Sequence, residues 1–155
     1  KMIIREFIKY DLEQILQLFY NTIHTINIKD YSKSQLDAWA LKSPDKEKWL
    51  HSLENNLAYV SELNGEIIGF GDLNDKRYID RLFTHKDYQG IGVASKILST
   101  LEQEAKKLGY REVYTEASIT AKPFFFNREY KILQSQNKHH NGQVFINYIM
   151  KKEIL

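Results

Sequence analysis

The sequence predicts an α/β protein in which a central mixed sheet of six or seven strands carries helices on both faces. The strand-like runs 57–63, 66–73 and 78–84 follow one another through short turns, which favours an antiparallel meander. A long amphipathic segment then leads to the run 112–118, the pattern of a β-α-β crossover. The 155 residues are 43% hydrophobic, enough to bury a substantial core, so we expect residues 2–155 to form one domain.

The N-terminal third is predicted to be mainly helical. Residues 2–8 alternate weakly and form a first strand. Asp11 is a candidate N-cap for a helix over residues 12–26, whose apolar residues recur at helical spacing. Two shorter helices are expected to follow, one opened by Ser32 or Ser34 and one that begins near Pro44.

Turn signals divide the rest of the chain. Asn64-Gly65 is the strongest hairpin signal, and Asn74-Asp75 marks a second turn. An apolar stripe from Val93 to Leu108 predicts a long helix that Gly109 ends. A short helix with Pro123 in its first turn is expected over residues 120–130. Two last strands, 131–137 and 143–151, flank a turn formed by His139-His140-Asn141-Gly142.

Composition excludes several classes of protein. The 22 basic residues nearly balance the 20 acidic ones, for a net charge of +2, whereas a nucleic-acid-binding protein concentrates basic charge on one face. The absence of cysteine excludes disulfides and thiolate catalysis, and it suits the reducing cytoplasm in which we expect the protein to act. No apolar run approaches the roughly 20 residues of a membrane span, and no signal peptide is visible. Neither nucleic acid nor a membrane is therefore expected as a partner.

The most informative stretch is the loop before the long helix, Gln89-Gly90-Ile91-Gly92-Val93-Ala94. Its two glycines let the backbone turn tightly and present several N–H groups at a helix N-terminus, which forms a socket for an anion such as a pyrophosphate. A Walker loop would end in Gly-Lys-Ser/Thr, but Val93 follows the second glycine. A dinucleotide-binding loop would need a third small residue further on. The alternative to an anion site is a strand-to-helix turn without a ligand.

The pattern Gln-x-x-Gly-x-Ala, carried by Gln89, Gly92 and Ala94, resembles the acyl-CoA motif of the GNAT superfamily of N-acetyltransferases. The predicted order of elements is also similar to the GNAT order, so the resemblance covers nearly the whole chain. The segments 34–40 and 117–125 resemble a branch of small bacterial acetyltransferases. The resemblance implies a GNAT-like fold, acetyl-CoA as co-substrate and an amine of a small molecule or peptide as acceptor. The protein would be a monomer, or a homodimer paired through the exposed last hairpin.

The resemblance also implies where acetyl-CoA binds. The backbone N–H groups of the glycine loop would hold the pyrophosphate, with a hydroxyl added by Ser95. The pantetheine arm would lie like an extra strand in a gap between the run 78–84 and the run 112–118. The implied binding residues are Leu82, Phe83, Thr84, Gln89, Gly90, Ile91, Gly92, Val93, Ala94 and Ser95.

The late helix departs from the family pattern. Many members carry Asn-x-x-Ala and then, four residues after the alanine, a tyrosine that is assigned as the acid for the leaving thiolate. Here the three positions hold Ser118, Ala121 and Phe125, and a phenyl ring has no proton to donate. A positioned acid contributes roughly 100- to 10,000-fold, whereas orienting the reactants contributes on the order of 7–11 kcal/mol. The loss of the tyrosine is therefore compatible with an enzyme.

The reaction needs a neutral amine, and a primary amine with a pKa near 10 is mostly protonated at pH 7. Asp80 is the first candidate for the base, with Glu116 or an ordered water as alternatives. On an ideal strand Asp80 shares a face with Tyr78, Leu82 and Thr84, although a β-bulge would change that facing. Alternatively, Asp80 pairs with a cation such as Arg77.

Tyrosines and a backbone amide complete the candidate catalytic set. Tyr148 joins Asp80 and Tyr78, and Tyr148 or Tyr130 could replace the missing acid. A main-chain N–H near Leu82 or Phe83 would meet the developing oxyanion.

Histidines are not the first choice for any role. His139 and His140 lie in the last predicted turn, and His140 reaches a substrate only if the last hairpin folds over the site. His24 either lines the acceptor pocket or lies on the surface of the first helix. No spacing of His, Asp and Glu indicates a metal site.

Two functions remain open at this point. The first is transfer of an acetyl group from acetyl-CoA to an amine by direct attack in a ternary complex. The second is a non-catalytic acyl-CoA sensor, which Phe125 favours.

Overall fold

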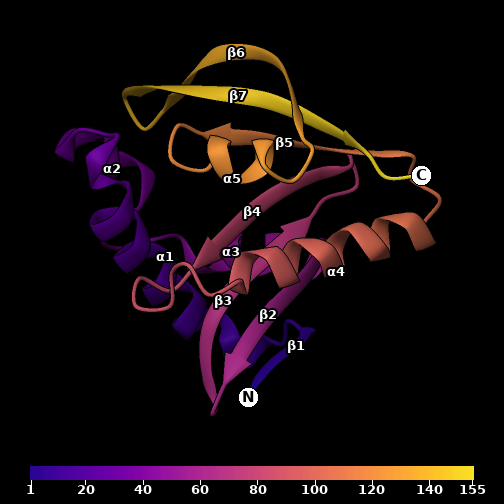
Figure 1. The fold of residues 1–155 in the computed structure, drawn as a ribbon. Coiled ribbons are helices and arrows are strands. Elements are labelled where there is room, and N and C mark those ends of the chain that lie inside the picture. Colours follow the sequence, from indigo (N-terminus) through magenta and orange to yellow (C-terminus); the bar gives the residue numbers. More distant parts are fainter.

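The computed structural model describes residues 1–155 and contains one seven-stranded sheet of order β1-β2-β3-β4-β5-β7-β6 (Figure 1). The strands are β1 (Met2–Glu6), β2 (Leu57–Leu63), β3 (Glu66–Leu73), β4 (Tyr78–Thr84), β5 (Glu112–Ser118), β6 (Lys131–His140) and β7 (Gln143–Glu153). The helices are α1 (Leu12–Ile26), α2 (Lys33–Trp39), α3 (Lys46–Asn55), α4 (Val93–Lys107) and α5 (Lys122–Phe126), with short 3₁₀ turns at Lys9–Asp11 and Asn27–Lys29. All neighbouring strands are antiparallel except β4 and β5, so the predicted mixed sheet is confirmed. None of the helices combines the length and the apolar character that a membrane crossing requires.

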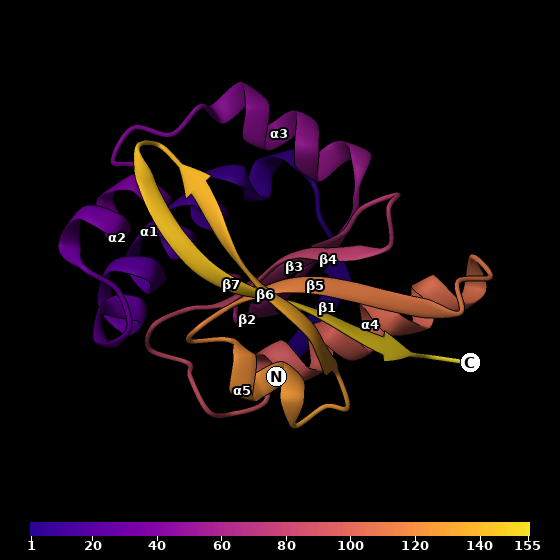
Figure 2. The same ribbon diagram turned by 90° about the horizontal axis from the view of Figure 1, so that it is seen from above.

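The sheet separates two hydrophobic cores. Figure 2, which looks down on the sheet, shows α1, α2 and α3 on one side and α4 and α5 on the other. β3 contributes to both cores because successive side chains of a strand point to opposite faces. Phe70 packs with the residues of α1 to α3, whereas Ile68 packs with those of α4.

Local signals set the starts of the helices, with one exception. Ser32 caps α2, where its hydroxyl accepts from the Gln35 N–H at 3.2 Å while the Gln35 side chain accepts from the Ser32 N–H at 2.9 Å. Asp45 caps α3 through the Lys48 N–H. Asp11 stands at the start of α1 as predicted, but its carboxylate does not cap the helix. Instead the buried carboxylate accepts two hydrogen bonds from Arg5, each 2.9 Å long, and so ties β1 to α1.

Two Asn-Gly pairs form the tight hairpin turns. Asn64 and Gly65 have φ values of 51° and 82°, and Asn141 and Gly142 have φ values of 46° and 78°. Positive φ at both central residues is the geometry that Asn-Gly favours in two-residue hairpins. The four-residue turn predicted at 139–142 was therefore too long, and His139 and His140 belong to β6.

A glycine in β3 allows α4 to lie close against the sheet. A Cβ atom on Gly69 would stand 2.5 Å from Cγ1 of Val93 and 3.3 Å from the Phe83 carbonyl oxygen. Val93 is buried, so its side chain cannot turn away from this contact into solvent. The first turn of α4, which follows the glycine loop, is thus fixed by a contact between β3 and Val93.

Gly69→Ala is expected to destabilise the fold by about 1–3 kcal/mol, because the added methyl group overfills this contact. Chemical denaturation of the variant measures the loss. Val93→Ala removes the opposing methyl groups, so the double variant should be less destabilised than the sum of the two single changes. Strict additivity of the two losses would contradict the contact.

Candidate active site

The sheet opens between its two parallel strands. β4 and β5 pair only at Tyr78 with Tyr114 and Ile79 with Thr115, and then diverge (Figure 1). A cleft of about 1180 Å³ occupies the opening and reaches both faces of the sheet. On the α4 side its lining includes Thr84, Gln89 and Ala94, and on the α1 side it includes aromatic residues of α1 to α3. The gap inferred from the family resemblance is therefore present.

A β-bulge in β4 decides which way Asp80 faces. Asp72 pairs with Arg81 and the next residue, Leu73, pairs with Ile79, so Asp80 is the extra residue in the register. The side chain of Arg81 reaches toward α3 and that of Leu82 lies beside Ile97 of α4. The expectation that Asp80 shares a face with Leu82 and Thr84 was based on a regular strand and is corrected by this bulge.

Asp80 lines the cleft without a counter-ion. Its carboxylate makes no hydrogen bond or ion pair, although it remains accessible from the cleft. The alternative partner, Arg77, binds Glu112 at 3.0 Å. Arg81 is held by the fully buried Asp72, by Ser52 and by the Trp49 ring, 4.7 Å away. Loss of hydration within the cleft, followed by repulsion from Asp72, raises the pKa of Asp80 above its ordinary value.

The glycine loop presents free amide groups at the start of α4. Gly90 and Gly92 have φ values of 75° and 88°, and a Cβ atom on either would meet no atom within 4 Å. The N–H groups from Gln89 to Gly92 donate to no group in the chain, and the next three lie in the first helical turn, where no helical acceptor exists. The Gln89 side chain donates to the Thr84 carbonyl at 2.9 Å and so closes the loop onto β4. Together these groups can bind an anion.

Arg128 brings a cation to this loop that sequence reasoning did not identify. Its guanidinium donates from Nε to the Ser95 hydroxyl at 2.9 Å and from Nη1 to the Phe124 carbonyl at 3.0 Å. The same group lies 3.7 Å from the centre of the Phe124 ring. Ser95 accepts from Arg128 and still has its own proton to donate. Because 33 residues separate Arg128 from Ser95, no short spacing in the sequence signals this pair.

The last hairpin closes the other end of the cleft. Figure 2 shows β6 and β7 extending over α1 and α2. The hairpin is attached there by two hydrogen bonds of 2.9 Å, from the Gln35 side chain to the Val144 carbonyl and from the Asn141 side chain to the Ala38 carbonyl. His140 consequently lines the cleft, which was expected only if the hairpin folded over it.

Several of the residues singled out in the sequence lie elsewhere. Tyr78 stacks on Tyr114 at 5.3 Å, and the Tyr148 ring lies 4.2 Å below the Lys122 ammonium. Neither tyrosine lines the cleft. The Tyr130 hydroxyl donates to Glu102 at 2.6 Å. Burial raises the pKa of this hydroxyl above the ordinary tyrosine value, which makes it a weaker acid.

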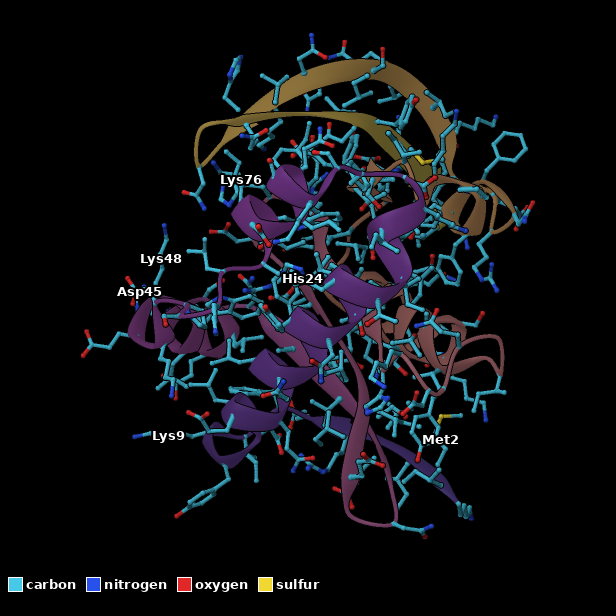
Figure 3. The ribbon with its side chains drawn as sticks, turned by 90° about the vertical axis from the view of Figure 1, so that its left-hand side faces the viewer. Met2, Lys9, His24, Asp45, Lys48 and Lys76 are labelled. Atoms are coloured by element: carbon cyan, nitrogen blue, oxygen red, sulfur yellow. The ribbon has the colours of Figure 1, made fainter.

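The other ionisable candidates are held by neighbouring groups. Glu116 pairs with Lys138 at 2.6 Å at the edge of the cleft. His24, labelled on α1 in Figure 3, contacts the Ala40 carbonyl at 2.9 Å and does not line the cleft. No cluster of three His, Asp or Glu side chains has the arrangement of a metal site.

Comparison with known proteins gives the family. Residues 27–152 match the family model described as an acetyltransferase (GNAT) domain. The chain belongs to the GNAT acetyltransferase family. The YafP protein of Escherichia coli K12, described as an N-acetyltransferase, is 30% identical over 148 residues, which cover 96% of this chain and 93% of that protein. The MJ1207 protein of Methanocaldococcus jannaschii is 28% identical over 120 residues, which cover 71% of this chain and 50% of that protein.

Solved structures agree with this GNAT assignment. A GCN5-related N-acetyltransferase from Rhodopseudomonas palustris superposes with a TM-score of 0.94 at 30% identity, over 97% of this chain and 94% of that one. A PaiA N-acetyltransferase from Thermoplasma acidophilum, solved in complex with coenzyme A, superposes with a TM-score of 0.82 at 19% identity, over 99% of both chains. The second likeness concerns the fold alone. Together with the open β4–β5 gap, these matches confirm the family inferred from Gln89, Gly92 and Ala94.

Proposed function

We propose that this GNAT protein transfers an acetyl group from acetyl-CoA to a primary amine by direct attack in a ternary complex. One observation carries the proposal: a single cleft passes through the sheet from the glycine loop to Asp80 and the α1 side. Two substrates that enter from opposite faces would meet between β4 and β5. The absence of cysteine excludes a thioester-linked acyl-enzyme.

Backbone groups on the α4 side suit acetyl-CoA. The free N–H groups from Gln89 to Ser95 and the Arg128 guanidinium would hold the pyrophosphate. The His85 N–H donates to β3, so the backbone groups of Leu82 and Thr84 point the other way, into the gap. The Thr84 carbonyl already accepts from Thr22 and Gln89. Leu82 thus retains free backbone groups for the pantetheine arm or the thioester oxygen.

Asp80 would act as the base, directly or through a water. The raised pKa makes the Asp80 carboxylate a stronger base, because it narrows the difference in pKa from the amine that it must deprotonate. The amine nitrogen then forms a bond to the acetyl carbon as the carbon–sulfur bond breaks. The electron pair of that bond leaves on sulfur, and the Leu82 N–H faces the carbonyl oxygen as charge develops there. Phe125 has no proton to give, so the thiolate, with a thiol pKa of about 8.5, takes its proton from solvent.

Calorimetric titration with acetyl-CoA and with CoA tests the first half of this proposal. Micromolar binding of both is expected. Release of CoA thiol is then followed during incubation with acetyl-CoA and a panel of primary amines, against a blank without protein. Failure to bind either nucleotide would rule out the proposed reaction.

A non-catalytic acyl-CoA sensor is the second candidate, because Phe125 replaces the family's usual acid. Its ring is 96% buried between Phe124 and Tyr130 rather than free for another role. Thiol release above the blank for any amine would exclude the sensor. Binding of acetyl-CoA with no release for any amine would favour it.

Arg128→Met is expected to weaken acetyl-CoA binding about 10-fold, because one charge-assisted contact to phosphate is lost. The loss should shrink as salt is added, since ions screen the guanidinium. Arg77→Met is the matched control, because Arg77 also lies against a ring, that of Tyr110 at 5.1 Å, but far from the loop. Calorimetry at two salt concentrations measures both variants. Equal acetyl-CoA affinities of the Arg128→Met and Arg77→Met variants would show that Arg128 positions Ser95 and does not contact the phosphate.

A further inference from the structure

We infer that the acceptor is a primary amine joined through a short linker to a flat aromatic ring. This inference rests on the proposed acetyl transfer and concerns only the α1 side of the cleft. Two observations support it: a continuous wall of aromatic side chains and a single unpaired carboxylate.

The aromatic wall lies on the α1 side of the cleft. Phe83 of β4 packs against Phe19 with ring centres 4.9 Å apart and against Trp39 at 6.3 Å. Trp39 in turn contacts Tyr31 at 5.3 Å and Phe145 of the last hairpin at 6.0 Å. The residues of this wall that line the cleft are Phe19, Tyr20, Tyr31, Trp39, Trp49, Phe83 and Phe145.

Four members of the aromatic wall keep exposed surface. Tyr20, Trp39, Trp49 and Phe83 are only half-buried, although all four pack against the core. Ring faces left open in an aromatic cluster bind another ring in edge-on or offset geometry. An aromatic acceptor would complete the cluster, whereas a polar chain laid against these rings would lose hydration and find no hydrogen-bond partner among them.

Three of the cations around this part of the cleft are paired with carboxylates. Lys46 pairs with Glu13 at 2.8 Å and Lys138 pairs with Glu116 at 2.6 Å. Arg81 is neutralised by Asp72. Lys42 and Lys48 are exposed at the outer rim, and Figure 3 shows Lys48 with Asp45 at the start of α3. The exposed Asp45 carboxylate also lines the cleft, but it accepts from the Lys48 N–H as the cap of α3. Asp80 is the one cleft carboxylate that makes neither an ion pair nor a hydrogen bond, which fits an acceptor with one amine.

The distance along β4 limits the linker. Asp80 and Phe83 are three residues apart, so their Cα atoms are separated by at most about 10 Å at a strand rise of roughly 3.3 Å. Both residues line the cleft. An amine placed at Asp80 and a ring placed at Phe83 and Trp39 are therefore connected by a chain of a few atoms. A polyamine or an extended peptide would carry its remaining polar groups across the aromatic wall.

Three amines test the substrate class on the CoA-saturated wild-type protein. 2-Phenylethylamine is expected to bind at least about 10-fold more tightly than putrescine. It should also bind more tightly than 2-cyclohexylethylamine, which is at least as apolar but not flat, because one ring pair contributes about 2- to 12-fold. The chain has two tryptophans and both line the cleft, so a change in tryptophan emission on binding reports occupancy of this wall.

Two variants locate the ring. Trp39→Leu should remove the preference for 2-phenylethylamine over 2-cyclohexylethylamine, whereas Phe126→Leu should keep it, since Phe126 is exposed and does not line the cleft. CoA binding by each variant shows that it is folded. If Trp39→Leu does not bind CoA, Trp49→Leu replaces it, with the same expected loss.

The outcomes separate this inference from the proposed function. Failure of the wild type to bind CoA would overturn acetyl transfer itself. Normal CoA binding together with equal or tighter binding of putrescine would overturn the aromatic acceptor and leave acetyl transfer standing. An aryl preference that survives both tryptophan changes would also overturn the placement on this wall.

Discussion

Replacing Gly92 with glutamate is expected to weaken CoA binding at least about 100-fold. Gly92 caps α4 with φ at 88°, and space beyond its Cα is open, so a glutamate side chain would enter the region we assign to pyrophosphate. Two unit charges 4 Å apart near a protein surface repel by about 4 kcal/mol, which corresponds to roughly 1000-fold. Calorimetric titration of the variant with CoA measures the loss.

Gly109→Glu is the matched control for this change. Gly109 ends the same helix with φ at 83°, and a Cβ atom there also meets nothing within 4 Å. Both variants therefore bear the cost of a side chain in the left-handed region, about 1–2 kcal/mol, and both add one negative charge. Only Gly92→Glu adds it at the loop. Unchanged CoA affinity in Gly92→Glu, or an equal loss in Gly109→Glu, would refute the assignment of the loop.

Asp80→Asn is expected to lower kcat by about 100- to 10,000-fold at neutral pH, because the amide cannot accept the proton of the amine. The KM for acetyl-CoA should change little, since Asp80 lies at the end of the cleft away from the glycine loop. In the wild type, activity should rise with pH as Asp80 loses its proton, at a pH above the ordinary aspartate range. The variant should not show this rise. Its activity should increase only at higher pH, where more of the amine is unprotonated. A pH–rate profile unchanged by the substitution would remove Asp80 as the base.

The same substitution should not destabilise the protein. The raised pKa means that the folded state binds the Asp80 proton more tightly than the unfolded chain. The Asp80 carboxyl therefore stabilises the fold most at low pH, where it is protonated. This contribution is lost as the pH rises from the ordinary aspartate pKa through the raised pKa of the folded protein, and it is not regained at neutral pH. Asp80→Asn removes this loss, so its melting temperature at pH 7 should equal or exceed that of the wild type. Glu116→Gln is the control, because Glu116 sits on the adjacent strand with Lys138 as a partner.

The order of elements could be predicted because each has a local cause. Ser32 and Asp45 cap their helices, and Asn64-Gly65 turns its hairpin as expected. Asn141-Gly142 carries the same signal and forms the last turn alone, so the preceding histidines extend β6 instead of joining the predicted four-residue turn. The long β6 that results brings His140 to the cleft.

The parts of the site that could not be predicted depend on contacts between distant segments. The bulge at Asp80 arises from the register between β3 and β4, and a strand read alone gives no sign of it. Arg128, two residues after α5, reaches Ser95 in the first turn of α4 across 33 positions of sequence. The ion pair of Arg77 with Glu112, which leaves Asp80 free, likewise joins residues 35 positions apart.

The attachment of the last hairpin to α2 divides the chain into two functional parts. The acceptor side of the cleft is built largely from residues 13–52 and 138–147, to which β4 adds Asp80 and Phe83, whereas the α4 side comes from residues within the stretch 79–125. Gln35 and Asn141 join the two ends of the chain across the mouth. Mutations in residues 13–52 and 138–147 can therefore change acceptor recognition while the sequence of the central stretch, and with it the CoA side of the cleft, stays the same. A chimera that exchanges both terminal parts together would carry a new acceptor preference, whereas an exchange of one alone would break the hydrogen bonds that hold the mouth closed.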